Sequence, residues 1–323
     1  MPQAILGTAM TGSPQIRMRR LLCAALFLAA NWLGTSMAGM LRYADTQIDF
    51  FAPSNSTPND GFRDPQAAVG QPDTGHMLTA PIDNESVIVS LGNGGSITLG
   101  FDRPVQNQPS SARNPHGYDL LIWGNAFISG IATSTTRFME PGIVEVAFDD
   151  GASEMLTWRL ILPRRFISGS AEDFLPSELD DTTRGNAEAL FDGFADVTPM
   201  SGAQLAVFLD SGELADLILD DPMTPTVEGL GGTGMALERA VAQLSPGVPI
   251  LDQDGQPQFV IVNQINRIRI SDALAGDMLT PATLGFVSSE VDGVIVLPNM
   301  VPEPTGAVML LIGMTLLRRT SRR

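Results

Sequence analysis

The sixteen residues from Val87 to Asp102, "VIVSLGNGGSITLGFD", decide the fold class. In their second half Ile97, Leu99 and Phe101 alternate with polar or small residues, which is the period of a β-strand with one buried face. Asn93-Gly94 suits a tight type I′ turn between two antiparallel strands. The stretch therefore predicts a β-hairpin. Its expected arms are Val87–Leu91 and Ser96–Phe101.

Short strands separated by turn residues recur along the chain. Asp150-Gly151 and Asp254-Gly255 predict two further hairpins, and Ile268 and Ile270 alternate with arginines in "INRIRI". In a chain rich in glycine and proline, this pattern predicts a mainly β fold, an antiparallel β-sandwich or jelly roll. The other expected strands are Ile143–Phe148, Glu154–Ile161, Val248–Leu251, Gln258–Val262, Tyr118–Trp123 and Asp292–Leu297.

Between residues 171 and 244 the pattern becomes helical. Residues 237–244 carry apolar side chains at helical spacing, and residues 205–218 suggest one or two shorter helices. We interpret residues 171–244 as a partly helical insertion that decorates a single sandwich domain spanning residues 39–300.

The charge of the chain excludes several kinds of partner. It carries 36 acidic and 19 basic residues, a formal net charge of −17, and every basic residue is arginine. All acids lie between Gly39 and Glu303, where only twelve arginines face thirty-six acids, so this part has a net charge near −24. Such a surface repels nucleic acid and anionic lipid, because both bind cationic patches. It suits calcium or neutral polysaccharide, or it is simply solvated.

The last stretch, residues 301–323, has three parts. Pro302-Glu303-Pro304 resists regular helix and should be extended. The apolar run Gly306–Leu317 follows, and at about 1.5 Å per helical residue it spans about 18 Å of a bilayer core that is about 30 Å thick. The terminal arginines should stay on the cytoplasmic side.

This tail resembles the PEP-CTERM sorting signal of Gram-negative bacteria, which the membrane enzyme exosortase reads. The resemblance implies that Pro302, Glu303 and Pro304 form a processing site. It also implies that the apolar run is a short transmembrane helix, the only membrane contact of the chain, that exosortase removes the tail, and that the mature protein goes to the cell surface or the extracellular matrix. The alternative is a hydrophobic C-terminal helix of the domain.

The other end of the chain predicts export as well. Met18-Arg19-Arg20, the likelier start of the protein, precedes the apolar run Leu21–Leu33. Small residues then permit cleavage between Ala38 and Gly39, so residues 1–38 form an N-terminal extension with a secretory signal peptide. The single cysteine, Cys23, lies in this peptide, and the mature chain forms no disulfide.

A second resemblance covers most of the chain between the two signals. Besides Val87–Asp102, it rests on "IWGNAF" (122–127), "EPGIVEVAFDDG" (140–151) and "LGFVSSEVDGV" (284–294). These motifs resemble a family of bacterial cell-surface proteins that often carry PEP-CTERM tails. The resemblance implies an exported protein with a β-sandwich domain and no particular activity. Where the family has "GGDAFDLADAV", this chain has "GGTGMALERAV", so an ion site that uses those acids is not expected here.

Catalytic motifs are scarce. Neither G-x-S-x-G nor H-E-x-x-H occurs, and the only histidines, His76 and His116, lie in expected loops, where we expect them to be solvated. Composition leaves a Ser-His-Asp triad open, but no pattern favours one. "LGNGGS" runs into a strand, whereas a phosphate loop runs into a helix, so we interpret it as a turn.

Carboxylates are the remaining catalytic candidates. Glu140 and Glu145 flank the start of an expected strand and could serve as the two carboxylates of a glycoside hydrolase or lyase. Glu145 shares a strand face with Ile143 and Ala147, where it needs solvent, a partner or a metal. We expect solvent.

Calcium is the one cofactor that the sequence makes plausible. Asp149, Asp180 and Asp220 are candidate ligands in loops at the edge of a sandwich. A full loop of the D-x-D-x-D-G type is absent.

The sequence supports three hypotheses about function. The first is a non-catalytic, exported surface protein whose domain binds extracellular polysaccharide or a neighbouring matrix component. The second is a hydrolase or lyase that uses Glu140 and Glu145. The third is a structural matrix protein with loops stiffened by calcium.

Overall fold

The computed structural model describes residues 41–53, 61–111, 114–128, 137–153, 155–162, 194–211, 217–219, 227, 229–272 and 288–298. They belong to one compact unit, Leu41–Val301. Most elements in these ranges are β-strands, paired in antiparallel fashion, so the expected mainly β fold is confirmed.

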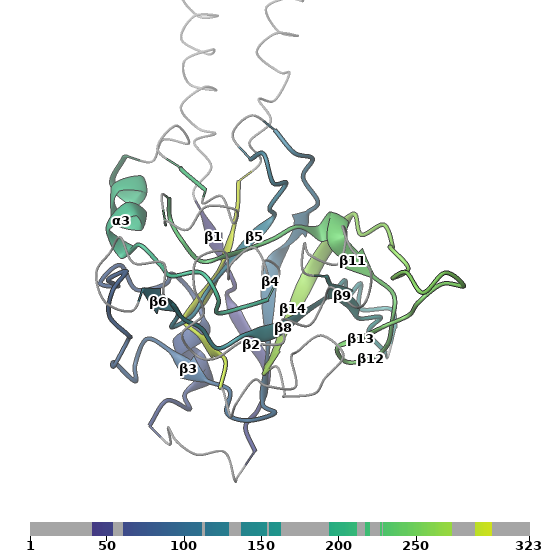
Figure 1. Cartoon of the computed structure of the whole chain (residues 1–323), viewed down its shortest axis with the longest axis horizontal. Helices are drawn as coiled ribbons and strands as arrows, with labels where there is room; N and C mark the ends of the chain where they lie inside the picture. Colours follow the sequence, from purple (N-terminus) through teal and green to yellow (C-terminus); the bar gives the residue numbers. More distant parts are fainter. Residues whose placement is uncertain are drawn as a thin grey trace, which may run out of the picture. The chain divides into compact units, whose positions relative to one another are not determined.

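The strands form two larger sheets (Figure 1). The four-stranded sheet contains, in spatial order, β1 (Arg42–Tyr43), β16 (Gly293–Val296), β5 (Leu120–Trp123) and β10 (Thr233–Met235). The six-stranded sheet contains β11 (Ala240–Val241), β9 (Arg159–Ile161), β8 (Gly142–Ala147), β14 (Gln264–Asp272), β4 (Ser96–Gln106) and β2 (Thr46–Phe51).

Strand β14 lies inside the six-stranded sheet, and its pairing with β4 and β8 shows how these three strands are aligned. Ile268 is paired with Leu99 of β4 on one side and with Val146 of β8 on the other. All three side chains are buried, because residues opposite one another in neighbouring strands share a face. The alternation in "INRIRI" thus sets which face of the sheet enters the core.

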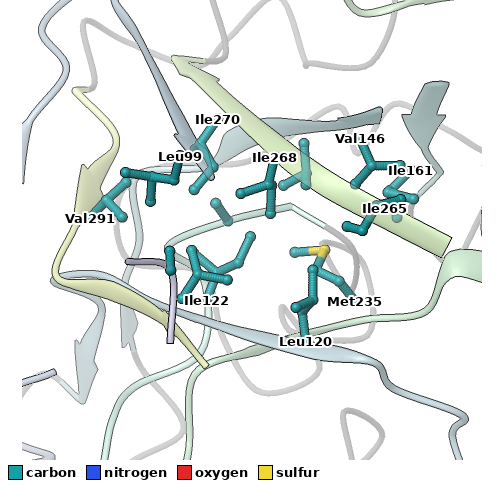
Figure 2. Packing of buried hydrophobic residues seen from close by; sticks show 14 of the residues in the cluster. Leu99, Leu120, Ile122, Val146, Ile161, Met235, Ile265, Ile268, Ile270 and Val291 are labelled. Carbon is teal, nitrogen blue, oxygen red and sulfur yellow. The ribbon is translucent and has the colours of Figure 1, made fainter. Parts of the chain in front are cut away.

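Side chains of both larger sheets pack into one hydrophobic core. Figure 2 shows Leu99, Ile268 and Ile270 of the six-stranded sheet pointing toward Leu120, Ile122 and Met235 of the four-stranded sheet. Two sheets that share a core are the layers expected of a sandwich. The jelly-roll strand order stays a prediction.

The expected hairpin at Val87–Phe101 is wrong in its pairing. Strand β3 (Val89–Ser90) pairs with β15 (Glu290–Val291), whereas β4 pairs with β14 and β2. The turn Gly92–Gly95 has Asn93 and Gly94 as its two central residues. Of these two, Gly94 has a positive φ and Asn93 does not. That geometry is type II, which does not match the twist of a two-residue hairpin, and the chain passes here from the β3–β15 pair into the six-stranded sheet.

Glycine is required at Gly95. A Cβ there would lie 1.8 Å from the carbonyl oxygen of Leu91, so no larger residue fits without moving the backbone.

Of the two other expected hairpins, the one around Asp150-Gly151 is confirmed in outline, whereas the arms around Asp254-Gly255 pair with each other only near the turn. Strands β8 and β9 are antiparallel, with Glu145 opposite Leu160. Around Asp254-Gly255 the pairing is shorter than expected: Asp252 N–H donates to Gln256 O (2.7 Å) and Gln258 N–H donates to Ile250 O (2.9 Å).

The stretch expected to be a helical insertion is partly helical. Helix α3 (Gly202–Ser211) confirms one expected helix. The expected helix at residues 237–244 is wrong, because a 3-10 turn, η5 (Leu237–Arg239), leads directly into β11. Strands β10 and β11 pair with β5 and β9, so this part of the stretch completes both larger sheets.

Four short pairs and turns complete the described structure. They are β12 (Gln243–Ser245) with β13 (Val248–Pro249), β3 with β15, β6 (Phe127–Ile128) with β7 (Arg137–Phe138), and the 3-10 turn η1 (Pro65–Ala68). In the described ranges no helix has the length and apolar character needed to span a bilayer. The apolar run Gly306–Leu317 lies outside those ranges.

Candidate functional site: a buried carboxyl cluster

The motif segments that are far apart in the sequence meet around residues 288–292. Ser288 Oγ lies 2.6 Å from Ser90 Oγ and accepts a hydrogen bond from Gly92 N–H (2.7 Å). At the end of β14, Asp272 accepts Gly94 N–H (2.9 Å) and Ser289 N–H (3.0 Å). The glycine-rich turn therefore does bind an anion, namely a carboxylate of its own chain.

Asp196 is the centre of the carboxyl cluster, which we define as Glu140, Asp196, Asp272 and Glu290. Its Oδ1 accepts the N–H groups of Asn125 (2.6 Å) and Ala126 (2.7 Å), and its Oδ2 accepts Glu290 N–H (3.0 Å). Its backbone adopts φ +55°, which only this non-glycine residue does among those described. The local strain is therefore maintained by three hydrogen bonds to two other segments.

The pKa of Asp196 is raised to about 8 by burial and by the nearby charge of Glu290. Its three backbone hydrogen bonds favour the charged form and lower the pKa, but burial has the larger effect. Glu290 Oε2 in turn accepts Asn125 Nδ2 (2.5 Å), so Asn125 joins both acids.

Glu140, a candidate catalytic residue, lies in the same cluster. Burial raises its pKa to about 9, with further contributions from Asp196, Glu290 and Asp272, while the hydrogen bond from Ser288 N–H (3.3 Å) lowers it. Glu140 N–H also donates to Asp196 O (3.2 Å). At neutral pH this side chain is therefore a protonated acid held beside other carboxyl groups.

Glu145, the second catalytic candidate, is not in this cluster. Its side chain is 0% exposed, and Oε2 accepts Arg269 Nε at 2.6 Å. The expectation that solvent satisfies it is wrong, because Arg269 on the adjacent strand supplies the charge partner. The Arg269 guanidinium also stacks on the Trp158 ring, 4.4 Å from its centroid.

The structure does not bring Glu140 and Glu145 together. Glu145 faces Arg269, whereas the electrostatic neighbours of Glu140 are Asp196, Glu290 and Asp272. A glycosidase needs two accessible carboxyls about 5–10 Å apart on either side of a bond. With Glu145 fully buried in an ion pair, the hydrolase hypothesis loses its second carboxylate.

Of the three candidate calcium ligands, only Asp149 lies in the described ranges. Asp149 forms an ion pair with Arg267 (2.9 Å), and its Oδ1 caps Gly151 N–H (2.9 Å). One oxygen of Asp149 thus bonds within the turn, and the other bonds to Arg267 of β14. Asp180 and Asp220 lie outside the described residues, as do Ala38, Gly39, Pro302, Glu303 and Pro304. Within the described ranges, no group of three or more His, Cys, Asp or Glu side chains could hold a metal ion.

The expectation that His76 is solvated is also wrong. Its side chain is 4% exposed, and Nε2 lies 2.7 Å from Asp292 Oδ2. Asp292 also accepts Asp73 N–H (3.1 Å), so it ties the loop at residues 73–76 to the start of β16. Burial raises the pKa of Asp292 to about 6, although the bond to His76 lowers it. Among the described residues, Asp292 is the hydrogen-bond partner of the His76 ring.

The large aromatic residues mostly serve the core. Trp123 is 0% and Tyr118 is 3% exposed, and Trp123 Nε1 donates to Gly231 O at 3.2 Å. Trp158 retains partial exposure but packs against Arg269. In these ranges neither the motif segments nor the outer sheet face carries a row of exposed Trp or Tyr rings, which is the usual platform for sugar stacking.

Neither a protein-family model nor a curated protein sequence matches this chain.

Proposed function

We propose that this chain is an exported protein of the cell surface or extracellular matrix, and that its β domain acts there without catalysis. The observation that carries the non-catalytic part is the state of Glu145: the second of the two candidate catalytic carboxylates is fully buried against Arg269. Asp149 and Asp292 are likewise bonded within the fold. A carboxylate that is fully buried in an ion pair is not exposed to a substrate.

The route of export is proposed from the two terminal segments. Export machinery would cleave between Ala38 and Gly39, and exosortase would process the chain at Pro302-Glu303-Pro304. The apolar run behind that motif would hold the chain in the inner membrane of a Gram-negative cell until it is cut.

Expression in a host with and without exosortase tests this proposal. The expected result is a mature chain in the surface fraction, which shifts to an uncut, membrane-bound form when exosortase is absent. A chain with Pro302 and Pro304 both changed to Ala should behave like the uncut form. A matched chain with Pro298 changed to Ala, outside the motif, should be processed normally.

The partner proposed for the domain is neutral extracellular polysaccharide or a neighbouring matrix component. Support comes from the acidic balance of the chain, which disfavours nucleic acid and anionic lipid. A pull-down with the purified mature chain on insoluble polysaccharide tests it, and recovery of all the protein in the unbound fraction would remove the polysaccharide part.

Calcium binding is proposed only through residues outside the described ranges, such as Asp180 and Asp220. Calorimetric titration of calcium into protein freed of calcium with a chelator tests this proposal. The comparison is a chain in which Asp180 and Asp220 are both changed to Asn. Equal heats for the two chains would exclude these residues as ligands.

A further inference from the structure

Six separate segments are joined through the carboxyl cluster. Asp196 bonds to Asn125, Ala126 and Glu290, and Glu140 bonds to Ser288 and to the backbone of residue 196. Asp272 bonds to the turn at Gly94 and to Ser289. The cluster therefore closes one end of the core, where β3, β8, β14 and β15 begin or end.

We propose that the carboxyl cluster is a pH-sensitive clasp: protons on Glu140 and Asp196 keep these segments together, and loss of the protons in alkaline surroundings loosens them.

The geometry supports the clasp because each acid faces other acids. Glu140 N–H donates to Asp196 O (3.2 Å) and Glu290 N–H donates to Asp196 Oδ2 (3.0 Å), which holds these three residues side by side. Charge repulsion from Asp196, Glu290 and Asp272 acts on Glu140, and repulsion from Glu290 acts on Asp196. Asp196, Asp272 and Glu290 are 1%, 4% and 3% exposed, so water screens their repulsion weakly. The burial that raises the pKa of Glu140 to about 9 and that of Asp196 to about 8 places the change just above neutral pH.

A second feature makes the clasp observable. Trp123 is followed by Gly124, and a Cβ on Gly124 would lie 2.4 Å from Asp196 Oδ1, so the carboxyl packs against this backbone. Trp123 O also accepts Asp292 N–H (2.8 Å), one residue beyond β15. Movement of Asp196 or β15 should therefore change the surroundings of the buried Trp123 ring.

The test follows Trp123 fluorescence in the full chain with Trp32 and Trp158 changed to Phe. Between pH 6 and pH 9.5 we expect a red shift centred at about pH 8–9, while far-UV circular dichroism stays constant. Glu140→Gln keeps an oxygen for Ser288 N–H and cannot ionise, so the shift at pH 9 should fall at least twofold. Asp196→Asn gives the same comparison on the other titrating group. Asp254→Asn, at an exposed turn, is the matched control and should leave the shift unchanged.

Three results would overturn the proposal. The parent chain may show no shift in this pH range, or the same shift may persist in both Glu140→Gln and Asp196→Asn. The third is failure of Glu140→Gln to fold at pH 6, since its amide keeps an oxygen for Ser288 N–H and otherwise replaces a protonated carboxyl closely.

Discussion

Replacing Arg269 with Met should destabilise the domain strongly. Glu145 is 0% exposed, and its Oε1 has no hydrogen-bond partner among the described residues, so the carboxylate depends on Arg269. Removing one partner of a buried ion pair costs about 3–5 kcal/mol, because the remaining charge is left without compensation. Loss of the stacking on Trp158 adds about 0.5–1 kcal/mol.

Arg267 on the same strand is the matched control. It is 21% exposed, like Arg269, but its partner Asp149 is 28% exposed rather than fully buried. Solvent screens such a pair, so Arg267→Met should cost only about 1 kcal/mol, including lost packing of the side-chain stem. The two variants differ mainly in the burial of the partner acid and in the stacking on Trp158, which only Arg269 makes.

Urea unfolding at pH 7, monitored by circular dichroism, measures the loss in the free energy of unfolding for Arg269→Met and for Arg267→Met. The double variant Glu145→Leu with Arg269→Met should recover most of the loss, because an apolar pair of similar volume can replace a buried ion pair at little cost. The coupling energy from the double-mutant cycle should then exceed about 2 kcal/mol. Equal costs for Arg269→Met and Arg267→Met, or additive effects of Glu145→Leu and Arg269→Met, would refute the structural role of Glu145.

Two further predictions concern Glu140 and Gly232. The pKa of Glu140 is raised from 4.5 to about 9, so its contribution to stability is complete below about pH 4.5 and is lost as the pH rises toward 9. Glu140→Gln should remove a decline of about 1.4 kcal/mol per pH unit between pH 5 and pH 8 in urea unfolding, and an unchanged slope would contradict the assignment. A Cβ on Gly232, at φ +78°, would lie 2.1 Å from Trp123 Cδ1, so Gly232→Ala should cost about 2–5 kcal/mol from strain and overpacking. Gly255→Ala, at φ +77° with open space around it, should cost only about 1–2 kcal/mol in the same assay, and equal losses would argue against the close packing on Trp123.

The positions of the strands were predictable from the sequence wherever one face of a strand enters the core. The alternation of Ile268 and Ile270 with arginines gave β14 and its buried face directly, since burial itself produces the period of two. The pairing of strands was less predictable. Val87–Leu91 was paired with its neighbour in the sequence, but the turn at Gly94 sends it to residues 290–291 instead.

The candidate site was harder to predict because it forms from contacts between distant segments. Glu140 was identified as a candidate, but its neighbours Asp196 and Glu290 lie 56 and 150 positions away and share no local pattern with it. His76 and Asp292 were missed for the same reason, since they are separated by 216 residues. The helical spacing at Leu237–Leu244 does not predict a helix because a 3-10 turn followed by a strand also buries Leu237, Ala240 and Val241, while Leu244 is exposed.

The central claim is that an acidic β domain is delivered outside the cytoplasm by two removable terminal segments. Mass spectrometry of the chain purified from the surface fraction of exosortase-containing cells tests it most directly. The expected mature protein begins at Gly39 and ends at or just before the Pro302-Glu303-Pro304 motif. Recovery of the intact chain from the cytoplasm, with the apolar run and terminal arginines still attached, would contradict it.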